Sequence, residues 1–164
     1  MNPTVLVALG SNLGDSITVL QDAMDRLQEF SAEPVRRSSL WTSSPVDCPP
    51  DSPGFVNAAA SLRPLPGETP ESLLHRLQDL EREAGRRPKK VHNEARPLDL
   101  DIIAWGDLTM RTDILVLPHP RAHLRRFVLQ PLAEIAPESV LPGTGHSIAE
   151  LLNAVPPDPG MRRI

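Results

Sequence analysis

Two amphipathic helical stretches, each set between short apolar runs, most strongly constrain how this chain can fold. In the first, Ser16–Phe30, apolar side chains recur at the three- and four-residue spacing of one helix face. The second, Glu71–Ala84, repeats this spacing and is followed by Gly85, a residue type that often ends helices. Each stretch therefore predicts a helix that buries one face against another element.

Four further segments predict strands, because they are short, apolar or β-prone, and bounded by turn residues. They are Thr4–Leu9, Val35–Thr42, Phe55–Leu62 and Leu98–Trp105. In chain order, the strands and helices follow one another as β-α-β-β-α-β. This order is typical of the split βαβ, or ferredoxin-like, α+β fold, which has an antiparallel sheet with helices packed on one face.

The remaining segments predict additions to this unit. A turn at Gly106 and Asp107 can open a short hairpin towards Ile114–Leu117. Helical patterns follow at Arg125–Ile135 and at Ser147–Asn153. We therefore expect an extra short hairpin and C-terminal helices beside the central sheet.

The composition fits an ordinary globular protein. The chain has 164 residues, of which 40% are apolar and 23% charged, a balance that excludes wholesale disorder. No apolar run is long enough to span a membrane, and we expect no secretory leader. Cys48 is the only cysteine, which excludes a disulfide scaffold or zinc finger and fits a cytoplasmic protein. We expect a single domain over residues 1–164, with a loose proline-rich tail over 155–164.

Charge is unevenly distributed along the chain. The net charge is −4, but the stretch Arg86–Arg126 carries nine basic and five acidic side chains. A basic patch on an acidic protein favours a small anionic ligand over a long polyanion, although a solvated charged surface would give the same count. The five aromatic residues are too few to favour a stacking platform for single-stranded nucleic acid.

The segment Leu98–Ile102 is the sharpest local feature. Because alternate side chains of a strand share a face, Asp99 and Asp101 point one way and their apolar neighbours point into the core. Paired carboxylates often hold Mg²⁺ together with substrate phosphates, and nearby arginines are typical of phosphoryl transfer. The alternative is an exposed strand face with two solvated aspartates. The sequence Gly10–Gly14 is either a phosphate cradle or, as we favour, a simple turn.

No Walker A motif and no G-x-G-x-x-G fingerprint is present, which disfavours P-loop, protein-kinase and Rossmann enzymes. Six other motifs occur in order along the chain. They are 7–15 (VALGSNLGD), 45–46 (PV) leading to 55–59 (FVNAA), 80–81 (LE) with 85–86 (GR), 96–102 (RPLDLDI), 117–121 (LPHPR) and 125–132 (RRFVLQPL). Together they resemble the 6-hydroxymethyl-7,8-dihydropterin pyrophosphokinase family, over about residues 4 to 155.

The resemblance implies a ferredoxin-like enzyme that transfers pyrophosphate from ATP to the hydroxymethyl group of the pterin, releasing AMP, in folate biosynthesis. ATP and the pterin would be its partners, without nucleic acid or membrane, and we expect a monomer. By position, Asp99 and Asp101 would bind two Mg²⁺ ions. The catalytic residues that hold or neutralise phosphates would be Arg86, Arg96, His119 and Arg125.

The resemblance also implies two binding sites. ATP would contact Gln78 and Glu81 beside His119, and the backbone near Ile102 and Val116 would read the adenine. The pterin would lie between two aromatic rings, bonded to one amide and to two backbone segments. These residues are Phe55, Phe127, Asn57, Ser43 and Val46.

The chain departs from the family pattern in one loop. Pro88 stands where the family usually has arginine, and Asn93–Ala95 replaces Trp-Gly-Pro. These departures leave an alternative open: a paralogue of the same fold with weak or altered activity, which binds nucleotide or another pterin alcohol.

Overall fold

The computed structural model describes residues 3–12, 15–43, 54–85 and 97–164. The strands are β1 (Val5–Ser11), β2 (Arg36–Arg37), β3 (Trp41–Ser43), β4 (Phe55–Leu62), β5 (Asp99–Trp105), β6 (Met110–Arg111), β7 (Val116–Leu117) and β8 (Arg162–Arg163). The helices are α1 (Ser16–Leu27), α2 (Pro70–Glu83), α3 (Arg126–Ile135) and α4 (Ile148–Ala154), with 3₁₀ turns η1 (Gln28–Phe30) and η2 (Ala122–Leu124).

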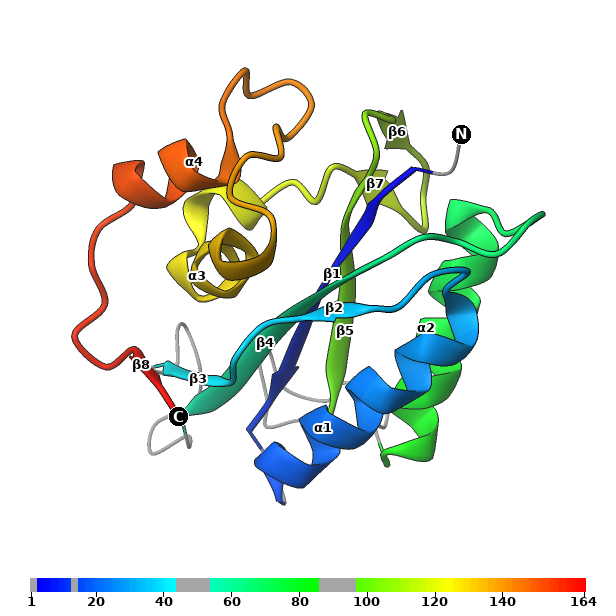
Figure 1. Ribbon diagram of the computed structural model, residues 1–164, viewed down its shortest axis with the longest axis horizontal. Helices are drawn as coiled ribbons and strands as arrows, with labels where there is room; N and C mark the ends of the chain where they lie inside the picture. The colour runs from blue at the N-terminus through cyan, green and yellow to red at the C-terminus, as the bar shows by residue number, and fades with distance from the viewer. Residues whose placement is uncertain (1–2, 13–14, 44–53, 86–96) are drawn as a thin grey trace.

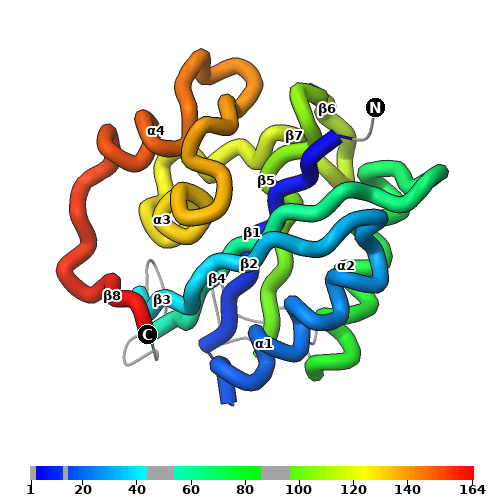
Figure 2. The backbone as a smooth tube through the Cα atoms, in the orientation of Figure 1, coloured from blue at the N-terminus to red at the C-terminus, as the bar shows by residue number. Residues whose placement is uncertain are grey.

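The main sheet is antiparallel, with strand order β5-β1-β4-β3-β8, and β2 also pairs with β4 (Figures 1 and 2). The two central strands, β1 and β4, pair along their whole length. Helices α1 and α2 connect strands that are parallel to each other and separated by one antiparallel strand. This is the ferredoxin-like arrangement, and it confirms the predicted fold class.

The predicted strand Val35–Thr42 is two short strands in the structure. Ser38, which lies between β2 and β3, accepts a hydrogen bond at its hydroxyl oxygen from the Ala59 backbone N–H over 2.8 Å. A side chain thus replaces the backbone acceptor at this position and interrupts the regular ladder. A short hairpin forms between β6 and β7 as predicted, but its turn is residues 112–115, whereas Gly106 and Asp107 turn the chain before β6.

Helices cover both faces of the sheet, whereas the sequence predicted helices on one face. Val5, Val7 and Leu9 of β1 pack with α1 and α2, while Leu6 belongs to a second core beneath α3 and α4 (Figure 1). The alternating residues of β1 are apolar on both faces, so both faces need cover. Among the described residues, no helix is both long and apolar enough to cross a bilayer.

Side-chain caps fix where the helices begin. The Thr69 hydroxyl accepts from the Ser72 backbone N–H, and the Ser72 hydroxyl accepts from the Thr69 N–H, which closes a capping box at the start of α2. Pro70 occupies the first turn, where a missing N–H costs nothing. A second capping box, between Ser147 and Glu150, starts α4.

The end of the chain has defined partners, although its prolines led us to expect a loose tail. From Val155 it runs past α3 to β8, which pairs with the outer edge of β3 (Figure 2). In this pairing Arg162 lies opposite Thr42, and Arg163 lies opposite Trp41. Proline removes helical and ladder hydrogen bonds from this segment, but it does not prevent pairing at residues beyond the prolines.

Candidate active site

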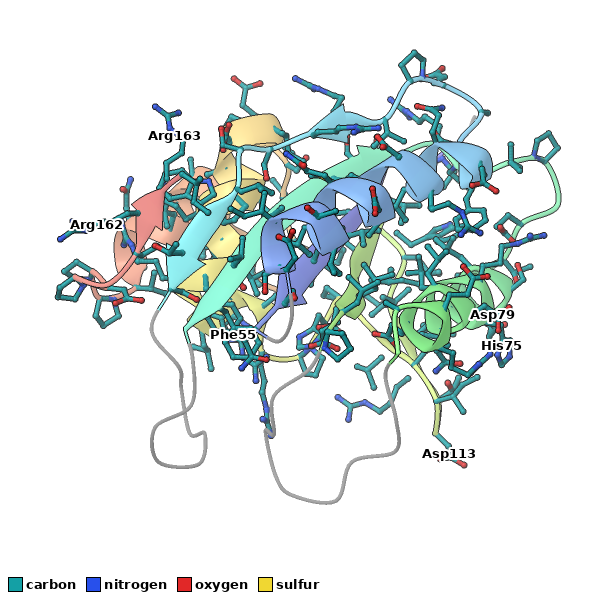
Figure 3. The ribbon with its side chains drawn as sticks, turned by 90° about the horizontal axis from the view of Figure 1, so that it is seen from below. Phe55, His75, Asp79, Asp113, Arg162 and Arg163 are labelled. Atoms are coloured by element: carbon teal, nitrogen blue, oxygen red, sulfur yellow. The ribbon has the colours of Figure 1, made fainter. Side chains whose placement is uncertain are left out.

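A cavity of about 500 Å³ lies on the α3 side of the sheet, at the end where β3 finishes and β4 and β5 start. Its floor is formed by β1, β3, β4 and β5, one wall by η2 and the first turn of α3, and the other wall by residues 155–159. Figure 3 shows Phe55 at this end of the sheet, away from His75 and Asp79, which point outward from α2.

The floor of the cavity is organised by one line of cross-strand neighbours. Gly10 of β1 is paired with Asp99 of β5 on one side and with Asn57 of β4 on the other. Neighbouring strands are about 4.8 Å apart, so Asp99 and Asn57 stand about 10 Å apart with a glycine between them. A carboxylate therefore marks one end of the floor and an amide marks the other.

Gly10 keeps the middle of this floor open. A Cβ atom placed on Gly10 would lie 3.4 Å from Oδ1 of Asn57 and 3.7 Å from Cδ1 of Phe55. Any side chain at this position would therefore occupy the space between the amide and the ring. The local sequence predicts a turn at Gly10, whereas Gly10 is in β1; strand register cannot be read from a local pattern, so this role could not be predicted.

The two aspartates take the arrangement that the alternation predicted. Leu98, Leu100 and Ile102 are buried in the core beneath α1 and α2, while Asp99 and Asp101 are half-buried and line the cavity. Within the described ranges no group of three or more histidine, cysteine or acidic side chains could hold a metal ion. The pair by itself fits Mg²⁺, which commonly takes one or two carboxylates and completes its shell with water and substrate phosphates.

Arginines form the wall opposite these aspartates. Arg121, Arg125 and Arg126 line the cavity from η2 and the start of α3. The guanidinium of Arg125 lies over the ring of Phe127, with Cζ 5.5 Å from the ring centroid, which is a cation–π contact. Of these three arginines, only Arg125 was predicted as a site residue.

His119 lies beside this group and stays neutral at pH 7. Burial lowers the pKa of His119 below its ordinary 6.5, and the charge of Arg125 lowers it further against the opposing effect of Asp99. Nδ1 accepts a hydrogen bond from the Arg121 backbone N–H over 3.2 Å. In the neutral ring the proton therefore sits on Nε2, which can act as a donor.

At the other end of the cavity, Asn57 and Ser43 form a bonded pair. The amide Nδ2 of Asn57 donates to the Ser43 hydroxyl oxygen over 2.6 Å, and both side chains are about 4% exposed. This bond fixes the amide plane, and the predicted pterin-binding residues Ser43, Phe55, Asn57 and Phe127 all line the cavity.

The predicted ATP-binding residues that lie outside the cavity gather along the outer edge of β5. Glu81, on α2, accepts from the Leu100 backbone N–H over 2.8 Å, and Gln78 lies one helical turn before it. The backbone N–H of His119 donates to the Ile103 carbonyl oxygen over 2.8 Å. Ile102 is in β5, and Val116 is in the adjacent β7. Val46, Arg86, Arg96, Pro88 and Asn93–Ala95 lie outside the described residues.

Comparison with known proteins identifies the family. The sequence model of the family 7,8-dihydro-6-hydroxymethylpterin-pyrophosphokinase (HPPK) matches residues 6–137 of this chain. This chain belongs to the HPPK family. The family is one of enzymes, named for pyrophosphoryl transfer to a pterin, and its members act in folate biosynthesis.

Bacterial relatives match this chain over most of their length. The Pseudomonas aeruginosa protein named 2-amino-4-hydroxy-6-hydroxymethyldihydropteridine pyrophosphokinase is 39% identical over 153 residues, which cover 93% of this chain and 91% of that protein. The Haemophilus influenzae protein of the same name is 38% identical over 142 residues, covering 86% of each.

Other relatives are much longer than this chain. The Pneumocystis carinii folic acid synthesis protein is 36% identical over 154 residues, but the chain spans only 20% of it. The crystal structure of wild-type Plasmodium falciparum HPPK-DHPS superimposes with a TM-score of 0.72 at 12% identity, covering 94% of this chain and 45% of that one. At this identity the likeness supports the fold alone.

Proposed function

We propose that this chain transfers the pyrophosphoryl group of ATP to the hydroxymethyl oxygen of 6-hydroxymethyl-7,8-dihydropterin and releases AMP. The observation that carries the proposal is that Asp99, Gly10 and Asn57 lie side by side on neighbouring strands, across the floor of one cavity. This arrangement sets a carboxylate at one end of the floor and an amide at the other, and arginines and aromatic rings line the same cavity. A substrate with a polar ring at one end and a reactive alcohol at the other fits this polarity.

The ring end of the cavity would bind the pterin. Phe55 lines the cavity from the floor strand β4 and Phe127 from the α3 wall, and a flat bicyclic ring held between them would stack on both faces. Asn57, whose amide is fixed by Ser43, offers hydrogen-bonding groups to the edge of the ring. The family resemblance adds the backbone near Val46.

The carboxylate end would bind the triphosphate. Asp99 and Asp101 share one face and line the cavity, so they would hold Mg²⁺. When bound there with ATP, Mg²⁺ would neutralise phosphate charge and polarise the phosphorus under attack. The family resemblance adds Arg86 and Arg96 as further cations for the transferring group.

In the reaction itself, the hydroxymethyl oxygen forms a bond to the β-phosphorus of ATP. The bond from that phosphorus to the oxygen bridging the α- and β-phosphates breaks, and AMP leaves with its electron pair. The proton of the hydroxyl passes to solvent or phosphate. The protein contributes chiefly by positioning the two substrates and stabilising charge.

Arg125 and His119 would assist at different points. Arg125 is permanently charged and held over Phe127, so it can bind a phosphate oxygen next to the pterin ring. His119 is neutral, with Nδ1 engaged by Arg121, so it would donate from Nε2 to a phosphate oxygen and would not accept the hydroxyl proton.

The adenine would lie at the outer edge of β5. Glu81 is engaged with Leu100, and Gln78 is on the same helix. The backbone near Ile102 and Val116 would supply the donor and acceptor groups that read the base.

Product analysis tests the proposal. The protein is incubated with ATP, Mg²⁺ and 6-hydroxymethyl-7,8-dihydropterin, and the nucleotides and pterins are separated by chromatography. We expect AMP and the pterin diphosphate in equal amounts. Formation of ADP would contradict the pyrophosphoryl step. Binding of both substrates without turnover would favour the alternative, a paralogue of weak or altered activity.

A further inference from the structure

A second cavity, of about 420 Å³, lies at the opposite end of the sheet from the candidate active site. Strand β1 begins at this cavity and ends at the active-site cavity, and β4 runs the other way. Thr4, before β1, and Ser61 and Leu62, at the end of β4, line its floor, while Ile135 and residues 136–139 form one wall. Among the described residues the two cavities share no lining residue, so the second one has its own chemistry.

Arg36 of β2 gives the floor of the second cavity a positive charge. Strand β2 lies along β4 (Figure 2), and Arg36 stands directly opposite Ser61. Because Ser61 alternates with Ala59, which is buried beneath α3, both Ser61 and Arg36 are on the α3 face of the sheet. The next residue, Arg37, is on the other face and forms an ion pair with Asp25 of α1 over 2.7 Å. Arg36 makes no such pair with any residue that the structure describes.

Ser61 adds a buried polar group beside this arginine. Its side chain is 6% exposed and lines the cavity, and within the described part of the chain its hydroxyl has no hydrogen-bond partner. Buried hydroxyl groups normally have one. A carboxylate in the cavity could accept from the Ser61 hydroxyl and from the Arg36 guanidinium, and such charge-assisted bonds are strong. Arg63 lies nearby, but its charge is balanced by Glu33, 3.6 Å away.

The wall formed by the end of α3 has the opposite polarity. The Leu132 carbonyl accepts from the Ala136 N–H over 2.8 Å, but Pro137 has no N–H to donate to the next carbonyl, that of Ala133. Carbonyl groups left at the C-terminal end of a helix carry the negative end of its dipole and favour a cation. Glu138, which is exposed and has no ion pair within the described ranges, adds a full negative charge to this wall.

We propose that the second cavity binds a small amino-carboxylic acid, with its carboxylate on Arg36 and Ser61 and its ammonium group at Glu138 and the end of α3. The positive and negative groups of the cavity come from different walls. A ligand whose two charges are separated by a chain or a ring therefore matches both walls. An anion alone would face the negative wall, and a cation alone would face Arg36, so the cavity disfavours either one.

The test is a titration of the full chain with 6-aminohexanoate, followed by NMR of the backbone amides. Hexanoate and hexylamine are matched probes, because each lacks one of the two charges. We expect the Kd of 6-aminohexanoate to be about tenfold lower than that of either probe. The shifted amides should be those of Thr4, Ser61 and Ser139, which line the second cavity, and not those of Gly10 and Asn57, which line the first.

Two variants separate the two ends of the ligand. Arg36→Gln should raise the Kd of 6-aminohexanoate about tenfold and remove its advantage over hexylamine. Glu138→Gln should instead remove its advantage over hexanoate. Arg37→Gln is the matched control, because it removes the same charge from the neighbouring residue on the other face of the sheet, and it should leave the Kd unchanged.

Three outcomes would overturn the proposal. In the first, the wild-type chain binds none of the three probes at millimolar concentration. In the second, hexanoate binds as tightly as 6-aminohexanoate, which would make the cavity a site for anions only. In the third, Arg37→Gln weakens binding as much as Arg36→Gln, which would show an effect of net charge alone. No outcome depends on pyrophosphoryl transfer, so a failure of the proposed function is measured separately.

Discussion

The ring of Phe127 supports the guanidinium of Arg125, whose Cζ lies 5.5 Å from the ring centroid at the start of α3. Under the proposed function this one side chain would serve both substrates, because its ring would stack on the pterin and its contact would hold a cation for a phosphate. We predict that Phe127→Ala raises the pterin Kd about tenfold or more and the ATP Kd much less.

Calorimetric titration of each substrate measures the two constants. Phe127→Leu is the matched control, because it keeps most of the apolar volume but removes the π-face, and it should give an intermediate pterin Kd. Thermal melts show whether either variant has lost its fold. Equal losses for pterin and ATP in Phe127→Ala would count against a stacking role.

The aspartates of β5 give a second prediction. Asp99→Asn and Asp101→Asn each remove one charge from the proposed Mg²⁺ site while keeping the shape of the side chain. We expect turnover to fall about 100-fold or more, and the Mg²⁺ concentration for half-maximal rate to rise. Asp113→Asn, an aspartate exposed on a distant turn, is the control and should behave as wild type (Figure 3). Wild-type turnover in either β5 variant would refute the metal assignment.

The periodic features of this chain were predictable, because each depends on a few neighbouring residues. The alternation around Asp99 and Asp101 fixed which side chains face the cavity, and strand Phe55–Leu62 has the predicted bounds. The meeting of Asp99, Gly10 and Asn57 was not predictable, since it depends on the register between strands far apart in sequence.

The C-terminal segment, residues 155–163, shows the same limit of local patterns. Its prolines predicted a loose tail, and locally that is what such a composition favours. Its attachments to Thr42 and Trp41 join residues about 120 positions apart, and no local pattern reports them. Helices α3 and α4 cover the second face of the sheet, which could not be predicted for a similar reason. The periodicity of a helix shows which of its own faces is apolar, but not which face of the sheet it packs against.

The buried carboxylate of Glu81 gives a third prediction. It is 8% exposed and accepts from the Leu100 N–H at the edge of β5, directly beside Asp99. Glu81→Ala would leave this buried N–H without that acceptor, and we expect the free energy of unfolding to fall by about 1–3 kcal/mol. Glu81→Gln keeps an acceptor and should lose less. Urea denaturation measures both, and equal losses in the two variants would contradict a role through this hydrogen bond.

A carboxylate outside the site gives the final prediction. Glu134 of α3 accepts hydrogen bonds from the Ser39 backbone N–H, over 3.0 Å, and from the Trp41 indole N–H, also over 3.0 Å. Partial burial acts to raise the pKa of Glu134, but the bonds from Ser39 and Trp41 outweigh it and hold the pKa below its ordinary 4.5. The bonds join α3 to the start of β3, which forms part of the cavity floor.

The depressed pKa fixes the sign of the pH dependence. Below about pH 4.5 the unfolded chain binds a proton at Glu134 more readily than the folded chain, so the stabilisation is present above this pH and is lost as the pH falls through the folded pKa. Because Glu134 is exposed and solvent screens its charge, Glu134→Gln should lower the free energy of unfolding by only about 0.2–1 kcal/mol at pH 7, and its difference from wild type should shrink as the pH falls below 4.5. Urea denaturation from pH 7 to about pH 3 measures this difference, with Glu138→Gln, an exposed glutamate beyond α3, as the control. A difference that stays constant over this range would show that the charge of Glu134 contributes nothing.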